Sequence, residues 1–233
     1  MLDYVEVTDW SIFNKHIAEK GFGIVREVVE SLKVVKESDY IISDEVIGFI
    51  RYDKYLREKL YMYLSVTEEF LRNELYKNLE YKGSKLIMYT SDYKYQDFKF
   101  IQNPDYGYSF FKRSKMLFSV ILDLFEHFAP NILPEFDFTI DDIKNVGKLR
   151  NIVMHHSLLM IDQNSTKTTK KSIEERVDLI TRYLTSLINI IPVEYRKGLI
   201  TDINKANLDN GIYGSKSKHI YIDHIQGGYD NGV

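Results

Sequence analysis

Cysteine is absent from this chain of 233 residues. Disulfide bridges and zinc sites built from thiolates are therefore excluded, and a reducing compartment is compatible with the composition. No uncharged stretch approaches the roughly 18 to 20 residues that a membrane-spanning helix needs. Residues 1–4 lack the cationic segment and apolar run that mark a secretory signal. We therefore expect a cytoplasmic protein without membrane attachment.

An excess of positive charge is also absent, since 31 Lys and Arg residues stand against 34 Asp and Glu residues, for a net charge of −3. Broad electrostatic binding of nucleic acid needs clustered Lys and Arg, so this balance disfavours a protein that coats DNA or RNA. It still allows a nuclease with one local site. The chain shows no phosphate-binding glycine loop, Ser/His/Asp hydrolase signature or zinc-ligand spacing. We expect neither a metal nor a cofactor.

Apolar residues recur at helical spacing through most of the chain. This spacing predicts four long helices, at about residues 52–81, 109–128, 139–160 and 172–191. It also predicts shorter helices at residues 11–19, 24–36 and 193–205. Strand signals are sparse, and residues 93–100 are interpreted as a loop. The pattern predicts an all-α fold, an antiparallel helical bundle with short N-terminal helices.

The predicted bundle forms a single domain over residues 1–206, with its core at about residues 50–191. The last 23 residues hold five of the twelve glycines. We therefore expect residues 207–233 to form a flexible, glycine-rich tail, with only a local alternation of apolar residues at 219–225.

Two of the long helices carry recognisable start signals. Thr139, followed by Asp141 and Asp142, predicts a capped and acidic start for the third helix. Ser172 with Glu175 matches a capping box for the fourth helix, which Pro192 should end. Pro130 and Pro134 should bracket the loop before the third helix.

The segment KLRNIVMHHS at residues 148–157 carries the chemistry of this sequence. It places Arg150, Asn151 and His155 at positions i, i+1 and i+5 of a predicted helix. The planar guanidinium of arginine suits a phosphate, and the imidazole of histidine suits proton transfer near neutral pH. Asn151 could orient His155 or the phosphate. On spacing alone, an arginine and a histidine five residues apart are more often ordinary surface residues than a catalytic pair.

Helical geometry separates the two adjacent histidines. On a helix of 3.6 residues per turn, His156 falls into the apolar stripe of Leu149, Ile152 and Val153. We therefore interpret His156 as a core histidine with a possible supporting role, whereas His155 lies on the outer flank.

The outer flank of this helix also carries two apolar residues, Met154 and Leu158. A solvated face would not normally present them between Arg150 and His155. We predict that they form the interface of a two-fold homodimer, which would bring two copies of each catalytic side chain into one cleft.

Residues 149–156 resemble the Leu-Arg-Asn-x-x-x-His-His consensus of the abortive-infection (Abi-like) branch of the HEPN superfamily. Residues 66–72, in which Glu68 precedes Arg72 by four positions, resemble an earlier helix of that family. The likeness covers about residues 50–191. Residues 1–50 lack the Gly-Tyr-Tyr-Arg-like segment of that branch, and Ser157 stands near where a basic residue often follows the two histidines.

The resemblance implies a HEPN-type fold and a metal-independent endoribonuclease, in which the 2′-OH of the RNA attacks the adjacent phosphate. It further implies a role in phage defence or as a toxin, often under an antitoxin or regulatory partner. Some members of the superfamily have lost activity and only bind RNA or protein. A catalytically inactive binding module is therefore the alternative, and a purely structural interaction module is a third reading.

Two further groups of residues have both a structural and a functional interpretation. Glu68 and Arg72 share one helix edge and can form a structural ion pair, or they can support catalysis. The loop before the fourth helix contains Lys167, Lys170 and Lys171. It can be an ordinary solvated loop, or it can guide RNA toward the site.

Overall fold

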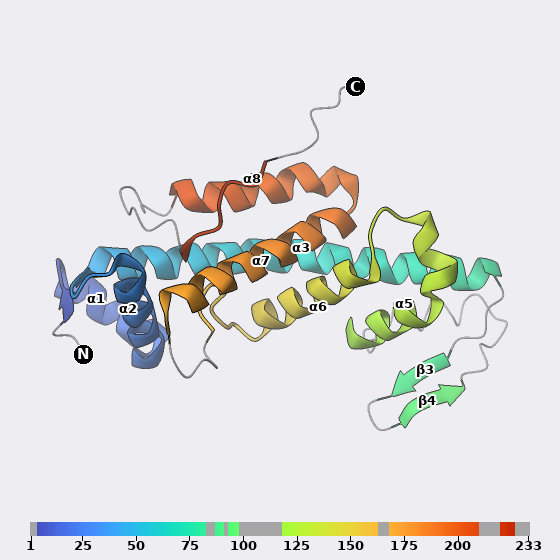
Figure 1. The fold of residues 1–233 in the computed structure, drawn as a ribbon, viewed down its shortest axis with the longest axis horizontal. Coiled ribbons are helices and arrows are strands. Elements are labelled where there is room, and N and C mark those ends of the chain that lie inside the picture. The colour runs from blue at the N-terminus through green and yellow to red at the C-terminus, as the bar shows by residue number, and fades with distance from the viewer. Residues whose placement is uncertain are drawn as a thin grey trace. The chain divides into compact units, whose positions relative to one another are not determined.

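The structure is a computed structural model that describes residues 4–82, 87–90, 93–97, 118–162, 168–209 and 220–226. Its elements follow the chain in this order (Figure 1): β1 (Val5–Glu6), α1 (Trp10–Lys20), α2 (Phe22–Lys36), β2 (Ile41–Ile42), α3 (Ser43–Lys82), β3 (Ile87–Thr90), β4 (Tyr93–Asp97), α5 (Phe118–Ile132), η2 (Leu133–Glu135), α6 (Ile140–Met154), α7 (Lys170–Ile190) and α8 (Val193–Asp209). Helices dominate the described residues, which confirms the all-α class.

Strands form only two short pairs in the described residues. β1 pairs in parallel with β2, with Val5 opposite Ile41. β3 pairs antiparallel with β4, with Ile87 opposite Asp97, so the loop predicted at residues 93–100 is in part a strand. In the described ranges, no helix combines the length and the apolar character needed to cross a membrane.

The contacts within the chain divide it into two compact units, and the single domain stays a prediction. The first unit consists of Met1–Tyr61, Asn151–Arg182 and Arg196–Val233. The second consists of Met62–Arg150 and Tyr183–Tyr195. Several helices contribute residues to both units, so the division follows three-dimensional contacts and not a linker in the sequence.

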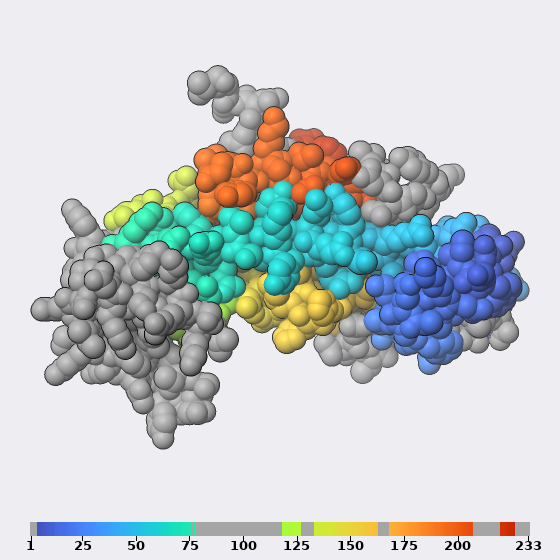
Figure 2. All heavy atoms as spheres, turned by 180° about the vertical axis from the view of Figure 1, so that it is seen from behind, coloured from blue at the N-terminus to red at the C-terminus, as the bar shows by residue number. Residues whose placement is uncertain are grey.

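Local signals determine where the N-terminal helices of the first unit begin and end. The side chain of Asp9 accepts hydrogen bonds from the backbone N–H groups of Ser11 and Ile12, at 2.8 and 3.1 Å, which starts α1. Gly21, at φ 85°, separates α1 from α2 in a backbone conformation that other residues rarely adopt. The side chains of α1 and α2 form one block in the space-filling view (Figure 2).

Residues 220–226 do not behave as a flexible tail. Ile220 and Ile222 are buried, at 0% and 1% exposure. The Ile222 backbone N–H donates to the Tyr52 hydroxyl at 3.0 Å. The Asn204 side chain of α8 bonds both backbone groups of Ile225, at 2.9 and 3.0 Å. The tail prediction is therefore wrong for this segment, and the alternation at 219–225 forms no strand within residues 220–226.

An aromatic cluster forms part of the core of the second unit. Phe136 and Phe138 stack with ring centroids 4.8 Å apart, and Phe70 of α3 meets both rings edge-on. Phe125 of α5 contacts Phe138 in the same way at 6.3 Å. Such edge-to-face pairs add to the free energy gained by burying the rings, because the ring edge is positive and the face is negative.

Several helix boundaries differ from the sequence prediction. α3 begins at Ser43, nine residues earlier than expected, with Asp44 in its first turn. α5 extends through Pro130 to Ile132, and its predicted start at residue 109 lies outside the described residues. α7 begins at Lys170, since the predicted Ser172–Glu175 box is replaced by one in which Ser172 and Thr169 exchange hydrogen bonds at 2.9 and 3.1 Å.

The packing of residues 220–226 is testable. Replacement of Ile222 by Ala should lower the free energy of unfolding by about 2 to 5 kcal/mol, because it empties a core position. The neighbouring His224 is exposed, so His224→Ala should change stability by less than about 0.5 kcal/mol. Chemical denaturation of both variants gives the comparison, and equal losses would contradict the packing.

Candidate functional site

Helix α6 begins at a reciprocal cap. The Thr139 hydroxyl accepts from the Asp142 backbone N–H at 3.2 Å, and the Asp142 carboxylate accepts from the Thr139 backbone N–H at 2.9 Å. This confirms the predicted start. Partial burial raises the pKa of Asp142, but the hydrogen bonds from Thr139 and its other neighbours outweigh burial and hold the pKa below its usual value. The helix then buries Ile143, Val146 and Leu149 on its apolar stripe.

The helix ends where the two histidines begin. His156 has φ 56°, in the left-handed region. Its backbone N–H bonds the Val153 carbonyl at 3.2 Å, and the Ser157 N–H reaches back to the Ile152 carbonyl at 3.2 Å. This pair of bonds is the Schellman motif, which satisfies the last carbonyls of a helix and turns the chain away from the helix axis.

The predicted helix to residue 160 is therefore wrong, because α6 stops at Met154. The side-chain directions predicted from a continuous helix are therefore wrong for the residues after Met154. His156 is exposed, so it is not a core histidine. Leu158 is only 3% exposed, so it is covered within its own chain and is wrong as a dimer-interface residue. Met154 is half-buried and keeps its outer position.

Two of the predicted catalytic residues, Asn151 and His155, are exposed at the end of α6. The Asn151 carbonyl accepts the backbone N–H of His155 at 3.0 Å. In the described part of the chain, no hydrogen bond or ion pair engages either side chain. Asn151 therefore does not orient His155 here, and both side chains are available to a ligand.

Arg150, in the second unit, is held by an acidic partner. Its Nε lies 3.3 Å from Glu68 Oε2, and Glu68 also forms the predicted ion pair with Arg72. The Glu68–Arg72 pairing is thus confirmed. The Arg150 contact spans 82 positions, so no local spacing in the sequence could have revealed it. The side chain of Arg150 remains 28% exposed, and Glu68 contacts its guanidinium through Nε.

The segment that follows the histidines is fixed by a clamp on Leu159. Its backbone N–H donates to Asp53 Oδ1 at 2.7 Å, and its carbonyl accepts from Arg176 Nε at 2.8 Å. The other oxygen of Asp53 accepts from Arg57 Nε at 2.7 Å. Charged side chains therefore satisfy both backbone groups of one buried residue.

Asp53 is fully buried, at 0% exposure of its side chain. Burial raises the pKa of Asp53, and Arg57 and the Leu159 N–H act in the opposite direction by stabilising the carboxylate. Asp53 is not among the site residues predicted from the sequence. Its signal was a carboxylate inside the apolar stripe of a helix, four residues before an arginine that can pair with it.

A pocket of about 520 Å³ lies in the first unit beside the histidine turn. α1 contributes Lys20 to its wall, and α3 contributes Arg57 and Tyr61. The end of α6 contributes Val153, and the turn after it contributes His156. The pocket therefore places cationic groups and an aromatic ring next to the residue that follows His155.

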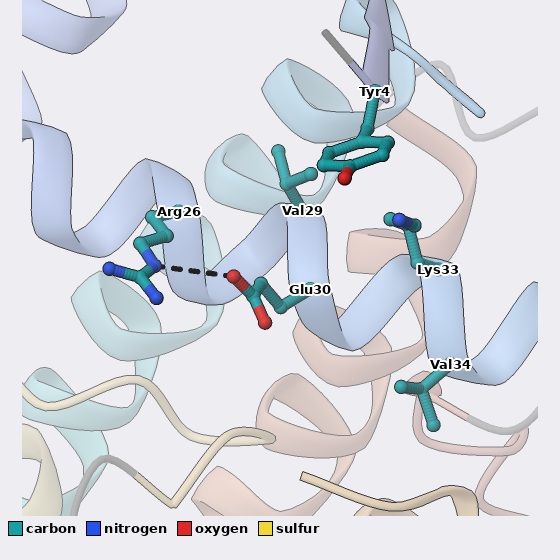
Figure 3. Close-up of a pocket in the computed structure, with 6 residues that line it drawn as sticks. All are labelled: Tyr4, Arg26, Val29, Glu30, Lys33 and Val34. Carbon is teal, nitrogen blue, oxygen red and sulfur yellow. Dashed lines mark hydrogen bonds and ion pairs between the residues drawn. The ribbon is translucent and has the colours of Figure 1, made fainter. Parts of the chain in front are cut away.

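A second pocket of about 510 Å³ lies along α2 (Figure 3). Its charged groups are engaged with neighbours in the first unit. Arg26 pairs with Glu30 at 3.2 Å, and Lys33 lies 3.7 Å from the centre of the Tyr4 ring. A ligand would have to displace these contacts, so we regard the pocket beside the histidine turn as the stronger candidate.

The basic loop supplies few available charges. Lys167 lies outside the described residues. Lys170 pairs with Glu37 at 2.7 Å, and Lys171 faces Glu175 at 3.6 Å. The contact with Glu37 raises the pKa of Lys170. The described structure thus favours a surface role for these two lysines over RNA guidance.

Among the described residues, no three His, Asp or Glu side chains gather as metal ligands would. No family model, curated protein or solved structure matches this chain.

The left-handed conformation of His156 predicts that glycine substitutions of the two histidines change stability in opposite directions. His156→Gly should raise the free energy of unfolding by about 1 kcal/mol, because glycine adopts this conformation without steric cost. His155→Gly should lower it by about 0.5 to 1 kcal/mol, since there is no positive φ to relieve and the unfolded chain gains freedom. Thermal unfolding of both variants gives the signs, and a loss for His156→Gly would contradict the turn.

The Leu159 clamp makes Asp53 a stability residue. Asp53→Ala should cost about 3 to 5 kcal/mol, because it leaves Arg57 and the Leu159 N–H without their buried partner. Asp53→Asn should cost less, since the amide oxygen can still accept from Leu159. Glu58→Ala, an exposed carboxylate on the same helix, is the control and should change stability by less than about 0.5 kcal/mol. Urea titration measures all three.

Proposed function

We propose that this protein is a metal-independent endoribonuclease of the HEPN type, with its site at the C-terminal end of α6. The observation that carries the proposal is the availability of Asn151 and His155. Both side chains are exposed, and neither has a partner among the described residues. Arg150, the residue before them, keeps part of its guanidinium exposed while Glu68 holds it.

The proposed reaction uses the nucleophile that RNA itself carries. A base removes the proton of the 2′-OH, the 2′-oxygen forms a bond to phosphorus, and the bond from phosphorus to the 5′-oxygen breaks. An acid gives a proton to the departing 5′-oxygen. The products are a 2′,3′-cyclic phosphate end and a 5′-OH end. The charge that develops on the phosphate oxygens is stabilised by Arg150.

The proposed reaction favours a site built from two copies of the chain. One imidazole cannot supply both the base and the acid within a single step, and a second His155 would complete the pair. Two-fold assembly around the half-buried Met154 would bring the two together. Leu158 is buried within its own chain, so the proposed homodimer rests on Met154 and on the need for a second proton-transfer group.

A catalytically inactive RNA- or protein-binding module is the second candidate. It is favoured by the Arg150–Glu68 contact, because a carboxylate next to the guanidinium reduces the positive charge available to a phosphate. The family resemblance would place either activity in phage defence or toxin action, under an antitoxin or other regulatory partner.

The decisive experiment is incubation of the protein with mixed RNA in EDTA, followed by analysis of the product ends. The wild type should yield 2′,3′-cyclic phosphate and 5′-OH ends. His155→Ala should reduce the rate by about 100-fold or more, since it removes the proton-transfer group. Arg150→Ala should also reduce it by about 100-fold.

His224→Ala is the control, because it deletes an exposed histidine that lies outside α6 and outside the pocket, and it should keep most of the cleavage rate. Full activity in folded His155→Ala would overturn the mechanism. Binding of RNA without any cleavage by the wild type would select the inactive module. Sedimentation velocity of the wild type and Met154→Glu tests the assembly, which should be dimeric only for the wild type.

A further inference from the structure

Three residues that carry hydrogen-bond donors line the pocket beside the histidine turn. They are Lys20, Arg57 and His156. Among the described residues, neither Lys20 nor His156 forms a side-chain hydrogen bond or an ion pair. Arg57 uses its Nε for Asp53 and makes no other hydrogen bond within that part of the chain.

The carboxylates that line the pocket are already engaged. Glu19 of α1 faces Lys15 at 3.9 Å, and Glu58 of α3 faces Lys54 at 3.5 Å. Lys20 is therefore the cation at this pocket whose charge is not taken by a neighbouring ion pair of the described residues. An anionic ligand would find donors here without having to separate an existing pair.

The buried Asp53 orients Arg57 for binding an anion. The side chain of Arg57 is 17% exposed and is fixed through Nε by the fully buried Asp53. A guanidinium whose Nε is hydrogen-bonded to a buried carboxylate keeps its terminal nitrogens in a fixed orientation. This lowers the entropy lost when a phosphate binds. The arginine and the Leu159 clamp thus share one carboxylate.

Tyr61 adds a flat apolar surface at the same pocket. It follows Arg57 by one helical turn and is 56% exposed. An exposed aromatic ring beside cationic groups is the combination that single-stranded nucleic acid uses, since a base stacks on the ring while its phosphate meets the charge.

We propose that this pocket binds a phosphate group of single-stranded RNA, with Lys20 and Arg57 on the phosphate oxygens and Tyr61 under the neighbouring base. The inference deepens the proposed function, on which it rests for the identity of the ligand. The strand bound there runs next to the turn that carries His155, so the pocket is the substrate-positioning part of the site.

The test uses a fluorescein-labelled single-stranded RNA with 2′-O-methyl groups, which cannot be cleaved through the 2′-oxygen. Fluorescence anisotropy in EDTA, at several salt concentrations, gives the dissociation constant and its salt dependence. Lys20→Ala should weaken binding about tenfold, the value of one charged hydrogen bond. It should also reduce the slope of log K against log salt by about 0.7, as expected for one lost phosphate contact.

Two further variants separate charge from stacking. Lys197→Ala removes the same charge from an exposed position on α8 outside the pocket, and it should leave both quantities unchanged. Tyr61→Ala should weaken binding about tenfold without changing the salt slope, because stacking releases no counterions. Circular dichroism confirms that each variant is folded.

Equal losses for Lys20→Ala and Lys197→Ala would overturn the pocket, as would a wild type that does not bind the RNA. Failure of the pocket and failure of catalysis remain distinguishable. If His155→Ala abolishes cleavage while Lys20→Ala leaves KM unchanged, the nuclease activity is supported and RNA binding at the pocket is contradicted. If Lys20→Ala and Tyr61→Ala weaken binding but neither the wild type nor any variant cleaves RNA, RNA binding at the pocket is supported and the nuclease activity is contradicted.

Discussion

The buried carboxylate of Asp53 fixes two parts of the first unit. One of its oxygens binds the backbone of Leu159, which follows the histidine turn, and the other binds Arg57 at the pocket wall. A buried charge is costly to desolvate, and it is tolerated here because an arginine and a backbone N–H both stabilise it. The same group therefore determines the path of the chain after α6 and the orientation of the arginine.

The second unit uses a carboxylate in a related way. Glu68 lies between Arg72 on its own helix and Arg150 on α6. The contact orients Arg150 but also lowers the positive charge that it can offer to a phosphate. This balance separates the two candidate functions, because a catalytic arginine must stabilise charge that develops during the reaction, whereas a structural arginine need not.

The left-handed conformation of His156 explains why two adjacent histidines have different roles. A helix that continued would have buried one and exposed the other. The turn instead exposes both, assigns His156 to the cap and the pocket, and directs Leu158 into the core. The proposed function therefore assigns proton transfer to His155, and the proposed phosphate site includes His156 with Lys20 and Arg57.

The sequence by itself determined the all-α class, most helices and the start of α6, because these depend on apolar periodicity and on caps within a few residues. It also determined the Glu68–Arg72 pair, which is local to one helix turn. Only the tertiary structure decided where α6 ends, since the left-handed residue is a histidine and no glycine or proline marks the stop. The Arg150–Glu68 and Leu159–Asp53 contacts join residues 82 and 106 positions apart, and residues 220–226 pack against distant helices. Such contacts arise from the fold as a whole, and no pattern within a short window of sequence encodes them.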